Sequence, residues 1–161
     1  VGRLNDKKSG EAGPLHETIQ AADGLLARLN ALMVEDVESF NAVVASWNLP
    51  DEDPSKNARK QEATLWATRI PLETMAKAIE VMRLAKVGLE GSKKSCLSDA
   101  GVAAFMAHAA LEGARLNVLT NLPNIADERK RAECRSEAER LHNEAEALRE
   151  EIDKAVEARC G

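Results

Sequence analysis

The sequence contains few of the residues that build β-sheets. Aromatic residues make up only 2% of the 161 residues, and tyrosine is absent. Sheet proteins need more β-branched and aromatic side chains than this. The abundant residues are instead Ala, Leu, Glu, Arg and Lys, which favour helices. The sequence therefore predicts an all-α fold, and its long helical segments predict an antiparallel bundle.

Features of secreted and membrane proteins are also missing. The three cysteines (Cys96, Cys134 and Cys160) are odd in number and far apart, which predicts free thiols rather than a disulfide framework or a zinc site. No apolar run approaches the roughly 20 residues needed to span a bilayer, and we expect no signal peptide. We therefore expect a cytoplasmic protein that has no membrane partner.

Several function classes are disfavoured by what the chain lacks. A formal net charge of −5 at pH 7 gives no long-range attraction to nucleic acid. No phosphate-binding loop, nucleophile elbow or metal-ligand spacing is found. We expect His16 and His142 to be exposed and His108 to pack in the core. No cofactor, metal or nucleic-acid partner is therefore predicted.

Prolines and glycines divide the chain into helical segments. The first runs from Pro14 to Leu49, and the second covers about 56–89, with Pro71 expected to kink or split it. A third segment covers about 98–122, and a charged last segment ends near residue 158. The apolar positions of the last segment form a narrow stripe, typical of a surface helix or of one half of a helix pair: Ala138, Leu141, Ala145, Leu148, Ile152 and Val156.

The first segment carries a heptad pattern with one polar interruption. Two apolar rows share one helix face: Leu15, Ala22, Leu29 and Val43, and Ile19, Leu26, Met33, Phe40 and Trp47. Asp36 stands where the first row should continue, so we expect a carboxylate in an apolar seam. It either pairs with an arginine across the bundle or serves in proton transfer. The two tryptophans, Trp47 and Trp66, are interpreted as core anchors.

The third segment is apolar on two faces, which predicts a helix at the centre of the bundle. One face carries Val102, Phe105 and Leu116, and the other carries Ala103, Met106, Ala110 and Gly113. Asp99 and Asn117 stand at the two ends of the second stripe. They lie roughly 27 Å apart along one helix, so they cannot contact the same reacting atom. Asp99 is interpreted equally well as a helix cap.

Several segments in order resemble the cyclodeaminase domain of formiminotransferase-cyclodeaminase and the free-standing methenyltetrahydrofolate cyclohydrolases. The matching segments are Asp36-Val37-Glu38-Ser39-Phe40-Asn41, Asn48-Leu49-Pro50, Ile70-Pro71-Leu72, Cys96-Leu97-Ser98-Asp99-Ala100-Gly101-Val102-Ala103-Ala104, Gly113-Ala114-Arg115-Leu116-Asn117-Val118, Asn121-Leu122 and Ile125-Ala126-Asp127. The resemblance covers nearly the whole chain with its spacing intact.

This resemblance implies an all-helical homodimer that acts on folates, with or without a polyglutamate tail, and needs no cofactor. It places the family's proposed catalytic carboxylate on Asp36, with Asp99 as a second catalytic candidate. Ser98, Asn117 and Asn121 match other characteristic positions and are candidates for substrate binding. Lys7 and Lys8 are candidates for binding the carboxylates of the folate tail, as are Lys93 and Lys94.

The resemblance also shows a departure. Family members carry a Pro-Gly-Gly-Gly-Ser segment and a helix ahead of the region where this chain begins, and Asn5-Asp6-Lys7-Lys8-Ser9 replaces a basic stretch. We therefore expect residues 1–161 to form a single domain without that segment and helix. The primary interpretation is formiminotetrahydrofolate cyclodeaminase, which releases ammonia. Methenyltetrahydrofolate cyclohydrolase is the close alternative, and a non-catalytic helical scaffold is a second one.

Overall fold

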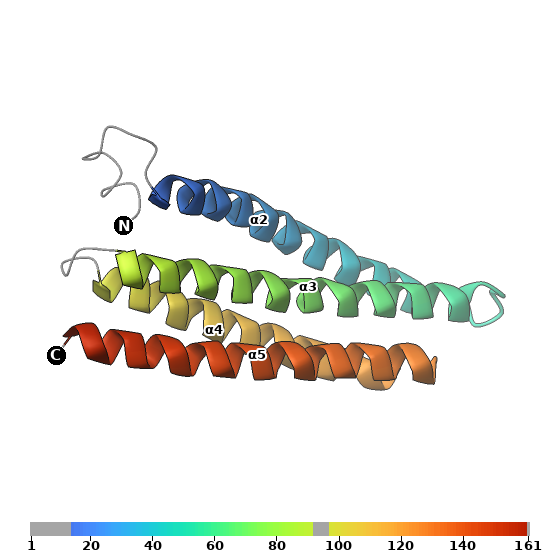
Figure 1. Ribbon diagram of the computed structural model, residues 1–161. Coiled ribbons are helices and arrows are strands. Elements are labelled where there is room, and N and C mark those ends of the chain that lie inside the picture. Colours follow the sequence, from blue (N-terminus) through green and yellow to red (C-terminus); the bar gives the residue numbers. More distant parts are fainter. Residues whose placement is uncertain (1–13, 92–96, 161) are drawn as a thin grey trace.

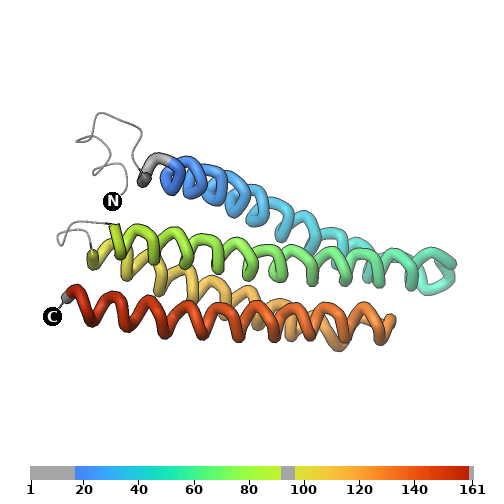
Figure 2. The backbone as a smooth tube through the Cα atoms, viewed as in Figure 1, coloured from blue at the N-terminus to red at the C-terminus, as the bar shows by residue number. Residues whose placement is uncertain are grey.

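The computed structural model describes residues 14–91 and 97–160 of the chain. They form four long helices: α2 (Pro14–Trp47), α3 (Lys56–Gly91), α4 (Leu97–Asn121) and α5 (Glu128–Cys160). A short 3-10 helix, η2 (Leu122–Asn124), joins α4 to α5. Consecutive helices run in opposite directions (Figures 1 and 2). The predicted all-α antiparallel architecture is confirmed for the described residues, which contain no strand.

Helix α3 lies at the centre of the arrangement and packs against α2, α4 and α5. The main hydrophobic core is formed by helices α3, α4, η2 and α5, together with Ile125, which directly follows η2. Its fully buried members include Met75, Met82, Leu111, Leu122, Ile125 and Ile152. The stripe predicted for the last helix is confirmed, because Ala138, Leu141, Ala145 and Ile152 are buried while Leu148 and Val156 pack partly buried against the core.

Helix α3 continues through Pro71 instead of splitting there. A proline inside a helix removes the N–H that would bond the carbonyl four residues earlier, which here belongs to Ala67. The side-chain amide of Asn121 donates a hydrogen bond to that carbonyl at 2.9 Å. This bond satisfies a group that would otherwise be orphaned, and it ties the end of α4 to the middle of α3.

The heptad prediction identified the wrong inward face for α2. The structure buries Leu25, Leu32, Ser39 and Ser46, each one residue before a member of the predicted row. Leu26, Met33, Phe40 and Trp47 are between 54% and 69% exposed. Because α2 packs mainly against α3, a single chain covers only one side of it. The apolar seam predicted around Asp36 is therefore open, and Trp47 and the 38%-exposed Trp66 are not core anchors.

Helix α4 is likewise covered on one face only. Its buried face consists mostly of small residues and is made of Leu97, Ala100, Gly101, Ala104, Ala107, Leu111, Ala114 and Val118. Both apolar faces identified from the sequence are exposed, including Val102, Phe105, Met106 and Leu116. The prediction of a central helix was wrong for the single chain, because α3 and α5 cover one side of α4 and no described helix covers the others. None of the described helices combines the length and apolar character needed to cross a membrane.

Candidate functional site

A polar-lined groove lies where α2, α3 and the end of α4 meet. One part of it is a cavity of about 440 Å³, within the size range of small-molecule sites. Its walls are Asp36, Ser39, Phe40, Val43 and Trp47 from α2, Lys60, Thr64 and Ala67 from α3, Asn117, Thr120 and Asn121 from α4, and Asn124 from η2. The groove therefore combines an acid, a base, amides and aromatic rings.

A second cavity, of about 360 Å³, adjoins the first. Both are lined by Asp36 and Asn117, so these two residues lie at the junction of one longer groove. The second cavity is mostly apolar, with Leu29, Leu32 and Met33 on α2 and small residues on α4. Gly113 lies in this wall, and a Cβ built there would meet no atom within 4 Å. An elongated ligand with a polar end and an apolar ring system would fit such a groove.

The carboxylate of Asp36 is exposed to this groove and unpaired within the described part of the chain. The backbone at this turn is fixed by neighbouring contacts. The buried Ser39 hydroxyl donates to the Asp36 carbonyl at 2.8 Å. Arg28 binds Glu73 of α3 through two hydrogen bonds of 2.6 and 2.8 Å and also contacts Glu35. Asp36 is thus held on a positioned helix turn and forms no ion pair within residues 14–91 and 97–160.

The Arg28 contact also favours the ionised form of Glu73. Its hydrogen bonds hold the pKa of the Glu73 carboxyl below the usual range, against the opposing effect of partial burial. Glu73 therefore stays ionised and binds Arg28, which attaches α2 to α3 at a position eight residues before Asp36. We infer no catalytic role for Glu73, since it lines neither cavity of the groove.

Two other predicted site residues, Asn117 and Asn121, line the same cavity as Asp36, and their side chains differ in hydrogen bonding. The Asn117 side chain has no hydrogen-bond partner among the described residues and is free to bind a ligand. The amide nitrogen of Asn121 is committed to the Ala67 carbonyl, which leaves its oxygen as an acceptor facing the groove. Asn121 therefore has a structural role that the position of Pro71 explains.

The remaining predicted site residues lie elsewhere. Ser98 and Asp99 are exposed in the first turn of α4, at the opposite end from Asn117, and line neither cavity of the groove. An acidic residue in the first turn also favours the helix electrostatically. Lys7, Lys8, Lys93 and Lys94 lie outside the described residues. A single chain therefore does not bring Asp36 and Asp99 together.

Among the groove residues that the sequence did not indicate as site residues, three carry a charge or an aromatic ring. Lys60 is half-buried in its wall, with no ion pair to any residue in the described ranges. Phe40 and Trp47 expose aromatic rings to the same cavity. Lys60 is one of several cations in its segment, so nothing in the spacing distinguishes it. The aromatic residues were assigned to the core because they fitted a heptad.

Comparison with known proteins identifies relatives along most of the chain. The profile of the formiminotransferase-cyclodeaminase family matches residues 1–140. A methenyltetrahydrofolate cyclohydrolase from Methylorubrum extorquens is 36% identical over 149 residues, covering 90% of this chain and 72% of its own length. A formimidoyltransferase-cyclodeaminase from Gallus gallus is 31% identical over 136 residues, or 82% of this chain, which spans only 24% of that longer protein.

A solved structure shares the fold. The crystal structure of formiminotetrahydrofolate cyclodeaminase from Thermotoga maritima superposes with a TM-score of 0.87 at 24% identity, over 100% of this chain and 80% of that one. The resemblance recognised in the ordered segments from Asp36 to Asp127 is thus confirmed by sequence and by fold. The chain belongs to the formiminotransferase-cyclodeaminase family of enzymes.

Proposed function

We propose that this chain is a tetrahydrofolate one-carbon enzyme whose substrate binds in the groove between α2, α3 and α4. The observation that carries the proposal is the Asp36 carboxylate, which lines the groove together with Asn117 and has no ion pair with any residue in the described ranges. Asp36 was also the position singled out by the resemblance. A carboxylate free of ion pairs can accept a proton and return it during one turnover.

Water addition to the methenyl carbon is the first activity to measure, because the cyclohydrolase relative matches most of both chains. Water attacks the carbon between N5 and N10 of 5,10-methenyltetrahydrofolate, and Asp36 takes one of its protons. The C–N5 bond then breaks, and Asp36 returns that proton to N5. The remaining hydroxyl proton leaves to solvent, which yields 10-formyltetrahydrofolate.

Cyclodeaminase chemistry is the second candidate, supported by the 31% identity to the chicken formimidoyltransferase-cyclodeaminase. Here N10 of 5-formiminotetrahydrofolate attacks the formimino carbon, and Asp36 takes the N10 proton. The formimino group reacts in its protonated, amidinium form, so its nitrogen already carries two hydrogens. The N10 proton passes from Asp36 to this nitrogen, which leaves as ammonia when the 5,10-methenyltetrahydrofolate cation forms. Both reactions pass through a tetrahedral carbon at the same place and need no redox cofactor.

The groove also offers groups for the rest of the substrate. The exposed rings of Phe40 and Trp47 provide stacking surfaces for the pterin ring. The free ammonium group of Lys60 can attract a carboxylate of the folate tail, including a polyglutamate tail. We place the protein in the cytoplasm as part of the same proposal.

Turnover assays on the two substrates test this function. We expect the purified chain to consume 5,10-methenyltetrahydrofolate faster than buffer alone does. The loss of the near-ultraviolet absorbance of this substrate measures the rate. With 5-formiminotetrahydrofolate, ammonia release would identify the cyclodeaminase activity. Heat-denatured protein is the matched blank, because methenyltetrahydrofolate also hydrolyses spontaneously. Rates equal to the blank with both substrates would contradict the proposal and favour the non-catalytic scaffold.

A homodimer is the second part of the proposal. The two helices α2 and α4, which both contribute to the groove, also expose large apolar side chains along their length: Leu26, Met33, Val34 and Val37 on α2, and Val102, Phe105, Met106 and Leu116 on α4. Monomeric proteins rarely expose contiguous apolar patches of this kind, and most oligomers are symmetric dimers. We propose that a second copy covers these faces, so that the groove lies at the subunit boundary.

A charge placed on this surface should prevent dimer formation. Met33→Asp would put an unpaired carboxylate under the second copy, which is costly when desolvated. We expect wild-type protein to sediment as a dimer at micromolar concentration and Met33→Asp as a folded monomer. Val87→Asp is the control, because Val87 is an exposed apolar residue of α3 outside these two helices. A monomeric wild type would contradict the proposal.

A further inference from the structure

Helices α4 and α5 each carry a histidine followed four residues later by a glutamate. The pairs are His108 and Glu112 on α4, and His142 and Glu146 on α5. A spacing of four residues places both side chains on the same helix face. Because the two helices pack against each other in opposite directions, the histidine of each helix faces the glutamate of the other.

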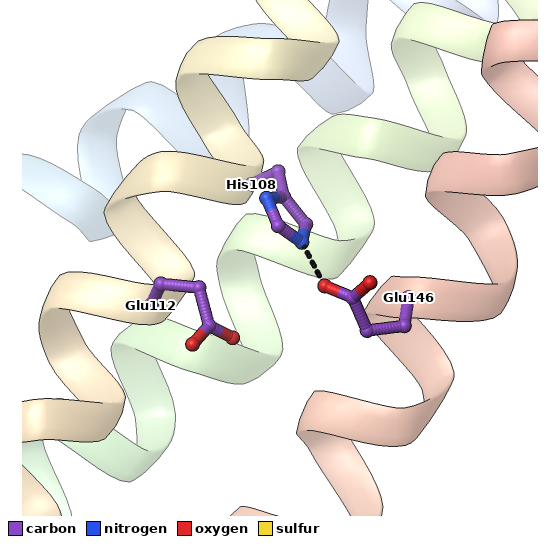
Figure 3. Close-up of side chains that lie close together, drawn as sticks. All are labelled: His108, Glu112 and Glu146. Atoms are coloured by element: carbon purple, nitrogen blue, oxygen red, sulfur yellow. Dashed lines mark hydrogen bonds and ion pairs between the residues drawn. The ribbon is translucent and has the colours of Figure 1, made fainter.

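The four side chains make direct contacts across the helix pair. The Nε2 atom of His108 lies 2.6 Å from Oε1 of Glu146, and Nδ1 of His142 lies 2.6 Å from Oε1 of Glu112. Figure 3 shows His108 and Glu112 on α4 turned toward Glu146 on α5. One ligand atom from each of these three lies within 4.8 Å of the other two. The expectation that His108 packs in the core and that His142 is exposed does not match this arrangement, since both are half-buried.

We propose that His108, Glu112 and Glu146 bind a divalent transition-metal ion of the zinc type, with His142 as a positioning residue. Two ligand atoms on one zinc ion, each at a bond length near 2.0–2.1 Å, stand about 3.3 Å apart in tetrahedral geometry. In the structure the three atoms lie within 4.8 Å of one another, which is close to this spacing. One imidazole nitrogen with two carboxylate oxygens suits Zn²⁺ or Co²⁺, whereas Mg²⁺ and Ca²⁺ favour oxygen ligands alone.

The surroundings of the three ligands support this assignment. His142 forms a hydrogen bond with one oxygen of Glu112, and Arg115 donates to the other oxygen at 3.3 Å. Partners of this kind commonly orient the carboxylates that bind a metal. Metal binding would replace the His108–Glu146 hydrogen bond with two coordinate bonds.

This site is separate from the folate groove, because none of the four residues lines either of its cavities. A metal held there would connect the middle of α4 to α5 and stabilise the helix pair, not take part in one-carbon chemistry. A metal at this position differs from the sequence-based expectation of no metal. The ligands come from two helices, and their convergence follows from how the helices are aligned, which no spacing along the chain reveals.

Metal titration of the full chain tests the site. Zn²⁺ and Co²⁺ are the probes and Mg²⁺ is the control, in a background with Cys96, Cys134 and Cys160 changed to Ser, so that thiols cannot bind the metal. We expect one Zn²⁺ per chain by calorimetry and a rise in melting temperature, because an ion that binds only the folded state stabilises it. Co²⁺ should give visible absorption bands typical of a four-coordinate protein site.

Single variants separate metal binding from simple ion pairing. His108→Gln, Glu112→Gln and Glu146→Gln should each abolish the metal-induced rise in melting temperature. Glu150→Gln, an exposed change on α5, should leave it intact. His142→Gln should weaken binding about 10- to 100-fold with the Co²⁺ spectrum unchanged. No binding by the parent chain, or binding unaffected by the first three variants, would show that the cluster is only two structural ion pairs.

Discussion

Asp36→Asn is expected to lower turnover of the folate substrate by about 100-fold or more while the protein stays folded. The asparagine keeps the size of the side chain but cannot accept and return a proton. Asp36 is exposed and forms no ion pair with the described residues, so its replacement should change stability by no more than about 0.5 kcal/mol. Turnover and thermal melting measured on the same preparation check both expectations.

The matched control for this variant is Glu38→Gln. Glu38 is an exposed acid two residues further along α2 and lines neither cavity of the groove, so its loss should leave turnover nearly unchanged. Asp99→Asn is a second comparison, because Asp99 lies outside the groove of the single chain. A marked fall in melting temperature for Asp36→Asn together with near-normal turnover would assign Asp36 a structural role instead.

The position of Asp36 was predictable from the sequence, but its environment was not. The heptad marked it as the polar residue in an apolar row, and the row was then assumed to be buried. Helix α2 has apolar residues on two neighbouring rows, Leu25 and Leu32 on one and Leu26 and Met33 on the other. A periodic pattern cannot decide which of two adjacent apolar rows meets α3. The contact with α3 selects the row that contains Leu25 and Leu32.

The grouping of Asp36, Asn117 and Lys60 depends on how three helices are arranged in space. Each residue belongs to a different helix, and local pattern does not determine which turn of one helix faces which turn of another. For Asn121, one half of the contact was predictable. Its partner is the carbonyl left without a donor by Pro71, and a proline inside a helix always predicts such a carbonyl four residues earlier.

Helix bounds were predicted more accurately than helix orientation. Pro50 and Pro123 lie close to observed helix ends, and Asp127 caps α5 by accepting a hydrogen bond from the Lys130 N–H at 3.1 Å. The inward face of α5 was also correct, because its apolar stripe is narrow and its other faces are charged. For α4 the sequence does not decide which face points inward, because apolar residues of this helix lie on almost every face.

Leu111→Ala should therefore cost much more stability than Leu116→Ala, although both residues are leucines of α4. Leu111 is fully buried in the main core, whereas Leu116 is 60% exposed. Truncating a buried leucine removes its apolar contacts and leaves a cavity, at a cost of about 2–5 kcal/mol. For a chain of this size, that loss lowers the melting temperature by about 4–20 °C.

Leu116→Ala should cost no more than about 0.5 kcal/mol in protein diluted until it is monomeric. Because the proposed second copy covers Leu116, the same variant should lower the melting temperature at concentrations where dimer forms, since binding between folded chains stabilises them by mass action. Urea unfolding of both variants at low and high protein concentration separates the two effects. Equal losses at low concentration would mean that α4 is rotated from the orientation described, and a Leu116→Ala effect independent of concentration would count against the dimer.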